Sequence, residues 1–164
     1  MDESRLMSSP LNGPLETAIR ALTLLAEAYP RSLDLNQLVL LDHGLLHSED
    51  LGGPPSLHPP VPIRSSELGV KRHQLTLGLE VLTRVGLADM SATTGGIHFT
   101  AAEGAHPFLS LLETSHARAL AERASWVVDR YGDLSDAGLR DAIREVSGRW
   151  AEEFENFHGG EQVT

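Results

Sequence analysis

The chain has 164 residues, with 23 acidic against 13 basic side chains, a formal net charge of -10 and no cysteine. The missing cysteine excludes disulfide frameworks, thiolate nucleophiles, cysteine zinc sites and iron–sulfur clusters, and the acidic balance argues against a protein that holds nucleic acid through its phosphates. Hydrophobic residues make up 41% of the chain, which suffices for the core of one domain with an appendage.

Charge is unevenly distributed along the sequence. Residues 1–63 sum to -5, residues 64–100 to +1 and residues 101–164 to -6, so two acidic ends flank a nearly neutral middle that contains the only lysine, Lys71. No stretch reaches the ~18 uninterrupted apolar residues of a membrane helix. Residues 1–11 lack the apolar core of a signal peptide. We therefore expect a cytoplasmic protein without a membrane partner.

The first elements in the chain are two helices. Residues 1–11 are polar and lack periodicity, so we expect a disordered segment there. The first helix follows, with Asn12 as its candidate N-cap and Pro14 in its first turn, and it ends before Pro30. Its spacing predicts a buried face made of Leu15, Ala18, Ile19, Leu22, Leu25 and Ala26. The second helix is expected over residues 34–46, capped by Ser32 or Asp34.

Residues 48–64 form a proline-rich insertion. Five prolines lie between positions 54 and 62, which neither a helix nor a central strand tolerates. Such a segment inside a compact domain is often functional, and its stiff, extended shape suits a partner's groove.

A third helix over residues 66–85 is followed by a hairpin, with strands at 87–90 and 97–100 and a turn between Thr93 and Gly96. Three helices and a hairpin are the order of a winged helix-turn-helix domain, which we place at residues 12–101. The string Glu67-Leu68-Gly69-Val70-Lys71-Arg72-His73-Gln74 resembles the turn and recognition-helix start of bacterial winged-helix regulators. This fold serves DNA binding and protein docking alike.

Two helices are predicted to complete a mainly α protein, as a C-terminal helical pair over residues 102–158. One spans about 102–131, and we expect His116 to fill a gap in its apolar stripe of Leu109, Leu112, Leu120, Ala124, Val127 and Tyr131. The other spans about 135–157, and Trp150, Phe154 and Phe157 are its interface candidates, with ordinary core packing as the alternative. Residues 159–164 are expected to be a disordered tail.

Several strings in residues 11–131 resemble the middle component of ABC-three-component antiphage systems, a group related to Lamassu defence. They are Leu11-Asn12-Gly13-Pro14, Leu45-Leu46-His47-Ser48 with Asp50, Ser56-Leu57-His58-Pro59-Pro60 with Pro62 and Arg64, Arg72 with Gly78-Leu79, Gly96-Ile97, and Glu122-Arg123-Ala124. The resemblance implies a small non-enzymatic subunit between an ATPase resembling the SMC and Rad50 proteins and a separate effector, often a nuclease. This sequence departs from the family in having His98-Phe99 in place of a wing tyrosine, and the 135–157 helix has no place in the family pattern.

The resemblance and the proline loop together select the candidate partner-binding or loop-defining residues. They are His47, Asp50, Leu57, His58, Pro59, Pro60, Arg64 and Arg72. We expect the two arginines to pair with Asp42, Asp50 or Glu67 and so to lock the loop to the helices. Pairing of two copies into a homodimer that bridges one ATPase dimer is a further expectation, as is a salt-sensitive contact between the acidic ends and a basic partner surface.

Catalytic and metal chemistry are weaker alternatives. No phosphate-binding loop is present, because the only lysine is followed by Arg72 rather than Ser or Thr. His43 and His47 lie four residues apart, so one helix face presents both, and Asp42, Asp50 and His58 are candidates to complete a metal site. The competing interpretation is that His47 and Asp50 bond to the loop backbone. Ser48, Ser56 and Ser66 lack a nucleophile elbow. We therefore predict no catalytic residue, metal or cofactor, and rank a metal-dependent hydrolase last.

The leading alternative to an adaptor is a winged-helix transcriptional regulator. It would read DNA through Lys71, Arg72, Gln74 and Thr76. Four bases in residues 64–100 neutralise few phosphates, however, and the acidic flanks repel DNA. The sequence therefore favours protein docking over a duplex, with any DNA contact indirect or non-specific.

Overall fold

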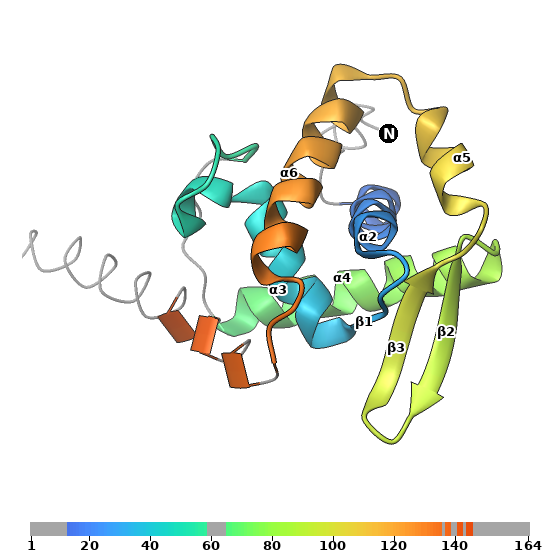
Figure 1. The fold of residues 1–164 in the computed structure, drawn as a ribbon, viewed down its shortest axis with the longest axis horizontal. Helices are drawn as coiled ribbons and strands as arrows, with labels where there is room; N and C mark the ends of the chain where they lie inside the picture. Colours follow the sequence, from blue (N-terminus) through green and yellow to red (C-terminus); the bar gives the residue numbers. More distant parts are fainter. Residues whose placement is uncertain (1–12, 59–64, 136, 139–140, 143, 146–164) are drawn as a thin grey trace, which may run out of the picture.

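The computed structural model describes residues 13–58, 65–135, 137–138, 141–142 and 144–145 (Figure 1). Its helices are α2 (Pro14–Ala28), α3 (Leu35–Leu46), α4 (Ser65–Arg84), α5 (Ala105–Ser110) and α6 (Ser115–Tyr131), and a short 3-10 helix, η1 (Ser48–Leu51), follows α3. Strands β1 (Leu33–Asp34), β2 (Ala88–Thr93) and β3 (Gly96–Ala101) form an antiparallel sheet in the order β1-β3-β2. The protein is therefore mainly helical with one small sheet. Within the described residues no helix is long and apolar enough to cross a membrane.

Helix starts follow the chemistry of their first residues. The N-cap of α2 is Gly13, which corrects the prediction of Asn12, and Pro14 follows where its missing N–H costs nothing. Asp34 begins α3 with a capping box, since its carboxylate accepts from Gln37 N at 2.8 Å while Asp34 N donates to Gln37 Oε1 at 2.9 Å. Asp34 rather than Ser32 is thus the cap of the second helix.

Helix α2 lies at the centre of the fold. It packs on α4 and α6, and α3 packs on the same two helices. Gly78 on α4 allows the close approach to α2, because a Cβ there would lie 3.1 Å from the backbone of Ala18. The core is rich in leucine, and its fully buried members include Leu22, Leu24, Leu25, Leu38, Leu41, Leu45, Leu75 and Leu79.

The β2–β3 hairpin projects away from the helices (Figure 1). Its register pairs Met90 with Phe99 and Thr93 with Gly96, and Gly96 adopts a φ of 116° that favours glycine at the turn. Strand β1, which the sequence did not predict, pairs Leu33 with Phe99 on the other side of β3. A strand of only two residues is too short to show an alternation of apolar and polar side chains, so only the fold identifies β1 as a strand.

The predicted helix over 102–131 is wrong in one respect, because it is two helices. α5 ends at Ser110, and Thr114 caps α6 by accepting a hydrogen bond from Ala117 N at 3.0 Å. A threonine side chain that satisfies a backbone N–H in this way starts a new helix rather than continuing the old one. His116 is exposed instead of filling the stripe, and Leu15 is 70% exposed instead of buried. Trp150, Phe154 and Phe157 lie outside the described residues.

Candidate functional site

One fully buried carboxylate joins three helices. Asp42 on α3 accepts from Arg20 Nε of α2 at 2.8 Å and from Lys71 Nζ of α4 at 2.5 Å. Arg20 is 3% exposed, and it reaches Asp42 Oδ2 with its Nη2 at 3.5 Å as well. Burial alone would raise the pKa of Asp42, but the charges of Lys71 and Arg20 outweigh it and hold that pKa well below its usual range. The only lysine of the chain is thus part of the framework.

Three histidine rings lie beside this ion cluster. The centroids of His43 and His47 are 4.9 Å apart, and that of His58 lies 6.1 Å from His47 in an edge-on arrangement. His43 and His47 are buried, and His58 reaches them from the proline loop. In the described part of the chain His43 Nε2, His47 Nδ1 and His58 Nε2 have no hydrogen-bond partner.

The three rings are neutral at physiological pH. Burial, followed by the neighbouring His47 and Lys71, lowers the pKa of His43 to about 3. Burial, followed by Lys71 and His58, lowers the pKa of His47 to about 4, and burial also lowers the pKa of His58. His43 Nε2 lies 3.9 Å from Asp50 Oδ2. Because the ring is neutral and the distance exceeds a hydrogen bond, this contact is not an ion pair.

The first part of the proline loop closes over the histidines through its backbone. Leu57 N and His58 N both donate to Leu46 O, at 3.0 and 3.1 Å, and Ser48 Oγ donates to Pro54 O at 2.7 Å. Gly52 makes the turn with a φ of 76°. These bonds hold the loop against the end of α3, because Leu46 and the Ser48 hydroxyl satisfy backbone groups of the loop.

Helix α6 holds the loop from outside. Arg123 donates from Nε and Nη2 to Pro55 O at 3.0 and 2.8 Å. Gly53 lies against the indole of Trp126, and a Cβ at that position would be 2.4 Å from the ring. The loop therefore has a defined shape from Ser48 to His58, anchored to both α3 and α6.

The structure brings together some of the predicted residues and separates others. His47 and His58 are in contact, Asp50 lies beside them, and Leu57 packs on the core. Arg72 is elsewhere, because it is exposed and donates to Asn36 Oδ1 at 2.5 Å, and Asp42, one of its predicted partners, pairs with Arg20 and Lys71 instead. The side chain of Glu67, another predicted partner, lies outside the described residues. Pro59, Pro60 and Arg64 lie outside the described residues.

Sequence reasoning missed the ion cluster. Arg20 was not selected, although it is the only charged residue in the otherwise uncharged stretch from Thr17 to Ala26. A lone arginine on a helix that is buried on most sides signals a buried partner, because an unpaired charge there would be costly. Trp126, which the sequence analysis also left out, carries no such signal.

The arrangement gives no support to a metal centre. Among the residues that the structure describes, no three His, Asp or Glu side chains are placed so that they could hold a metal ion. Ser48, a candidate nucleophile, is fully buried and its hydroxyl is bonded to a carbonyl.

Comparison with known families gives one match. Residues 10–153 match the model of the ABC-three component (ABC-3C) system Middle Component 2. The chain belongs to this family. It is therefore a component of a multi-subunit defence system, associated with other components of that system. Comparisons with curated proteins and with solved structures gave no match. The match covers the ion cluster, the histidines and the proline loop.

Proposed function

We propose that this middle component is a non-enzymatic adaptor that links an SMC/Rad50-like ABC ATPase to a separate effector, such as a nuclease, within a Lamassu-like antiphage complex in the cytoplasm. The observation that carries the proposal is that hydrogen bonds to α3 and α6 hold the loop in one shape. Arg123 and Leu46 bind its backbone, and neutral histidines pack beneath it. A pre-ordered loop loses little entropy on docking, which favours a partner contact.

The fold inferred for this adaptor is a winged helix. Helices α2, α3 and α4 precede the β2–β3 hairpin, and β1 completes the sheet at the base of the wing. Two such domains paired as a homodimer would match an ATPase dimer in symmetry.

The alternative, a DNA-reading regulator, is supported by the exposure of Arg72 and Thr76 on α4. It is weakened by Lys71, whose ammonium is engaged by Asp42 inside the fold. A mobility-shift assay with the purified chain at low salt tests it, and sequence-specific retention of a duplex would favour the regulator over the adaptor.

The adaptor role is tested with His58→Ala. The half-buried ring caps the cluster where the loop meets solvent, so its removal should weaken the complex with the ATPase by about 10-fold or more, as for a central interface residue. The measurement is co-purification of the three components, together with phage plating on cells that express them.

The matched control is His98→Ala, which removes another half-exposed histidine from β3 and should leave the complex intact. An intact complex and full phage protection with His58→Ala would remove the loop from the adaptor mechanism.

Co-purification should also decline as salt rises if the acidic ends contact a basic partner.

A further inference from the structure

Helix α4 carries an apolar stripe on its solvent side. Four large apolar side chains of this helix are exposed, at spacings of seven, four and four residues that place them on one face. They are Val70 (58% exposed), Leu77 (36%), Val81 (43%) and Val85 (62%). No described segment of the chain covers this stripe. An apolar helix face of this length normally packs against another element.

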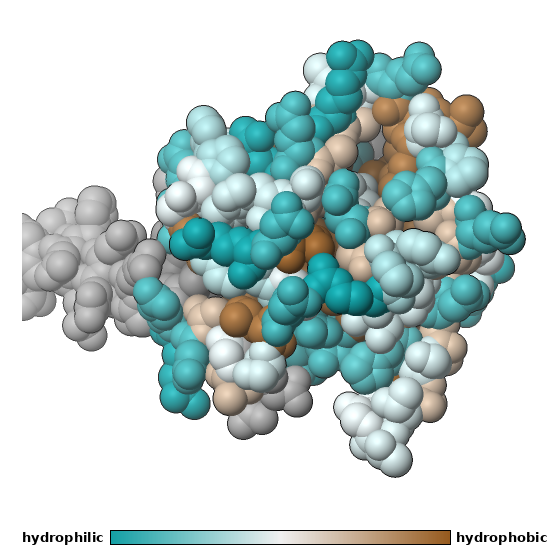
Figure 2. All heavy atoms as spheres, in the orientation of Figure 1, coloured by the Kyte–Doolittle hydropathy of each residue, from teal (hydrophilic) through white to brown (hydrophobic). Residues whose placement is uncertain are grey.

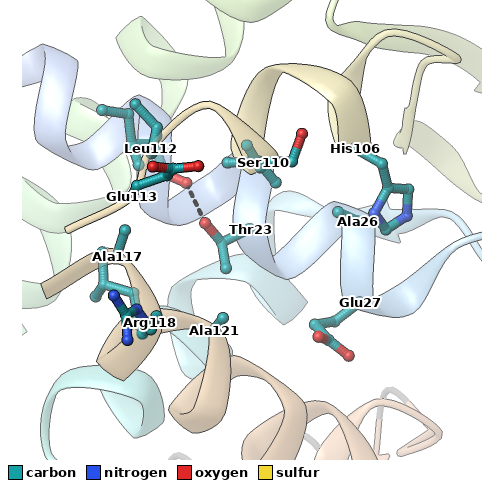
Figure 3. A pocket seen from close by; sticks show the side chains of 13 residues that line it. Thr23, Ala26, Glu27, His106, Ser110, Leu112, Glu113, Ala117, Arg118 and Ala121 are labelled. Carbon is teal, nitrogen blue, oxygen red and sulfur yellow. Dashed lines mark hydrogen bonds between the residues drawn. The ribbon is translucent and has the colours of Figure 1, made fainter. Parts of the chain in front are cut away.

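A second apolar area lies over α5 and its connection to α6 (Figure 2). Leu111 in this connection is 77% exposed. Its neighbours in the chain, Ser110 and Leu112, line a cavity of about 560 Å³ between α2, α5 and α6 (Figure 3). The exposed acids Glu27 and Glu113 line the same cavity. The described surface therefore offers two apolar areas, and they differ in the charges around them.

Charge decides which of the two areas suits a second copy of this chain. Helices α5 and α6 belong to residues 101–164, which sum to -6, so two copies facing each other there would repel. Helix α4 belongs to residues 64–100, which sum to +1. The only lysine, Lys71, is bound to Asp42 inside the fold. In a chain with a net charge of -10, α4 is thus where two copies can approach with the least repulsion.

We propose that two copies of the chain pair through the α4 stripe, with their α4 helices antiparallel and Val70 of one copy beside Val81 of the other. Gln74 then comes level with Leu77 of the second copy. The spacing of these four positions, at intervals of four, three and four residues, is that of the core positions of a coiled coil. An antiparallel pair also sets the two helix dipoles against each other, which a parallel pair does not.

The residues beside the stripe favour this register. Glu80 and His73 are exposed and lie seven residues apart along one edge of the stripe. In the proposed register Glu80 of one copy lies near His73 of the second copy, and the reverse contact is made by symmetry. A register that instead pairs Leu77 with Val81 would bring the two Glu80 side chains together, which like-charge repulsion disfavours.

This inference rests on the homodimer of the proposed function and assigns its contact surface. The tests use the purified full-length chain without an ATPase or an effector. A failure of the pairing is therefore distinguishable from a failure of the adaptor role.

Sedimentation equilibrium measures the pairing. The chain should form a reversible dimer with a Kd below ~100 µM. Val81→Glu should weaken this dimer at least ~10-fold, because the new carboxylate is buried against Val70 of the second copy. The matched control is Leu111→Glu, which places the same acid on an exposed apolar residue of the other area and should change the Kd by less than ~3-fold. A chain that stays monomeric at ~100 µM would overturn the proposal. Equal weakening by the two variants would overturn it as well.

The absence of cysteine allows a separate test of the register. An equimolar mixture of Val70→Cys and Val81→Cys chains should form an intermolecular disulfide under mild oxidation. Either variant alone should not, because the two copies of one position then lie about 17 Å apart along the helix axis, beyond the reach of a disulfide. No disulfide in the mixture would refute the antiparallel pairing, and so would a disulfide that forms equally fast in a single variant.

Discussion

The ion cluster and the cavity between α2, α5 and α6 differ in how their charges are paired. In the ion cluster Arg20 is buried and shares Asp42 with Lys71, so ion pairs join α2, α3 and α4. At the cavity Glu113 and Arg118 are among the lining residues, and neither forms an ion pair with another described residue. Charges that are fully paired stabilise the framework, and charges left free at a cavity are available to an occupant. Removing a charge from the ion cluster should therefore cost stability, whereas removing a charge at the cavity should cost little.

The largest expected effect is that of Asp42→Ala. Removing the carboxylate takes away the counter-charge that Asp42 supplies to Arg20 and Lys71 in a buried setting, which should cost about 3–5 kcal/mol of unfolding free energy. Urea denaturation measures it, and Asp89→Ala on the exposed strand β2 is the control, expected to change stability by less than ~0.5 kcal/mol. Similar losses for the two variants would contradict a special role for the ion cluster.

The second-largest expected effect is a loss of stability in acid, which arises from the buried histidines. His43 and His47 have folded-state pKa values of about 3 and about 4, below the ordinary value of 6.5. The unfolded chain therefore binds more protons below pH 6.5, so stability is constant above that pH and falls as pH drops toward 4, by up to ~1.4 kcal/mol per pH unit for each ring. The depressed pKa of Asp42 adds its own loss only below the ordinary carboxyl range.

Urea unfolding at pH 7.5, 6.0 and 5.0 measures this dependence. His43→Gln should reduce the slope but not remove it, because the pKa of His47 is also lowered. The control substitution is His73→Gln on the exposed face of α4. A flat profile in the unmodified protein between pH 7.5 and 5.0 would mean that the rings are not held neutral by burial.

The smallest effects come from two glycines with opposite surroundings. Gly53→Val places side-chain atoms against the Trp126 ring and should destabilise the protein by about 1–3 kcal/mol. Gly69→Ala in α4 meets open space and should stabilise it by about 0.5–1 kcal/mol through helix propensity. Thermal unfolding of both variants provides the comparison. Stabilisation by Gly53→Val would show that the loop does not pack on α6.

Sequence reasoning predicted the elements well where a strong periodicity or a cap was present. The spacing of α2, the Asp34 cap of α3 and the hairpin turn at Gly95-Gly96 were all visible in single segments. It failed at Leu15 and at Thr114. Periodicity shows which face of a helix is apolar, but not whether another segment covers it. A threonine acts as a cap or as a helix residue depending on the path of the chain.

In the candidate site, His47, Leu57 and His58 could be selected from the sequence because they stand in two unusual local strings. Their partners were not predictable in the same way. Arg20, Lys71 and Trp126 reach the site from three helices, and their distances along the chain carry no signal of contact. The predicted pairing of Arg72 with Asp42 was wrong, since Lys71, one residue earlier, donates to Asp42 while Arg72 donates to Asn36.

The sequence by itself determined the helical class, the hairpin, the proline-rich loop and the family strings, because each depends on residues close together in the chain. The tertiary structure alone decided which charges are paired and which are free. Burial and distance set the strength of an ion pair, and both arise only when α2, α3, α4 and α6 are packed together. The net charge of -10 therefore does not show where the acids act. Only the folded chain shows that Asp42 is neutralised by Arg20 and Lys71, whereas Glu113 lines a cavity without an ion pair to another described residue.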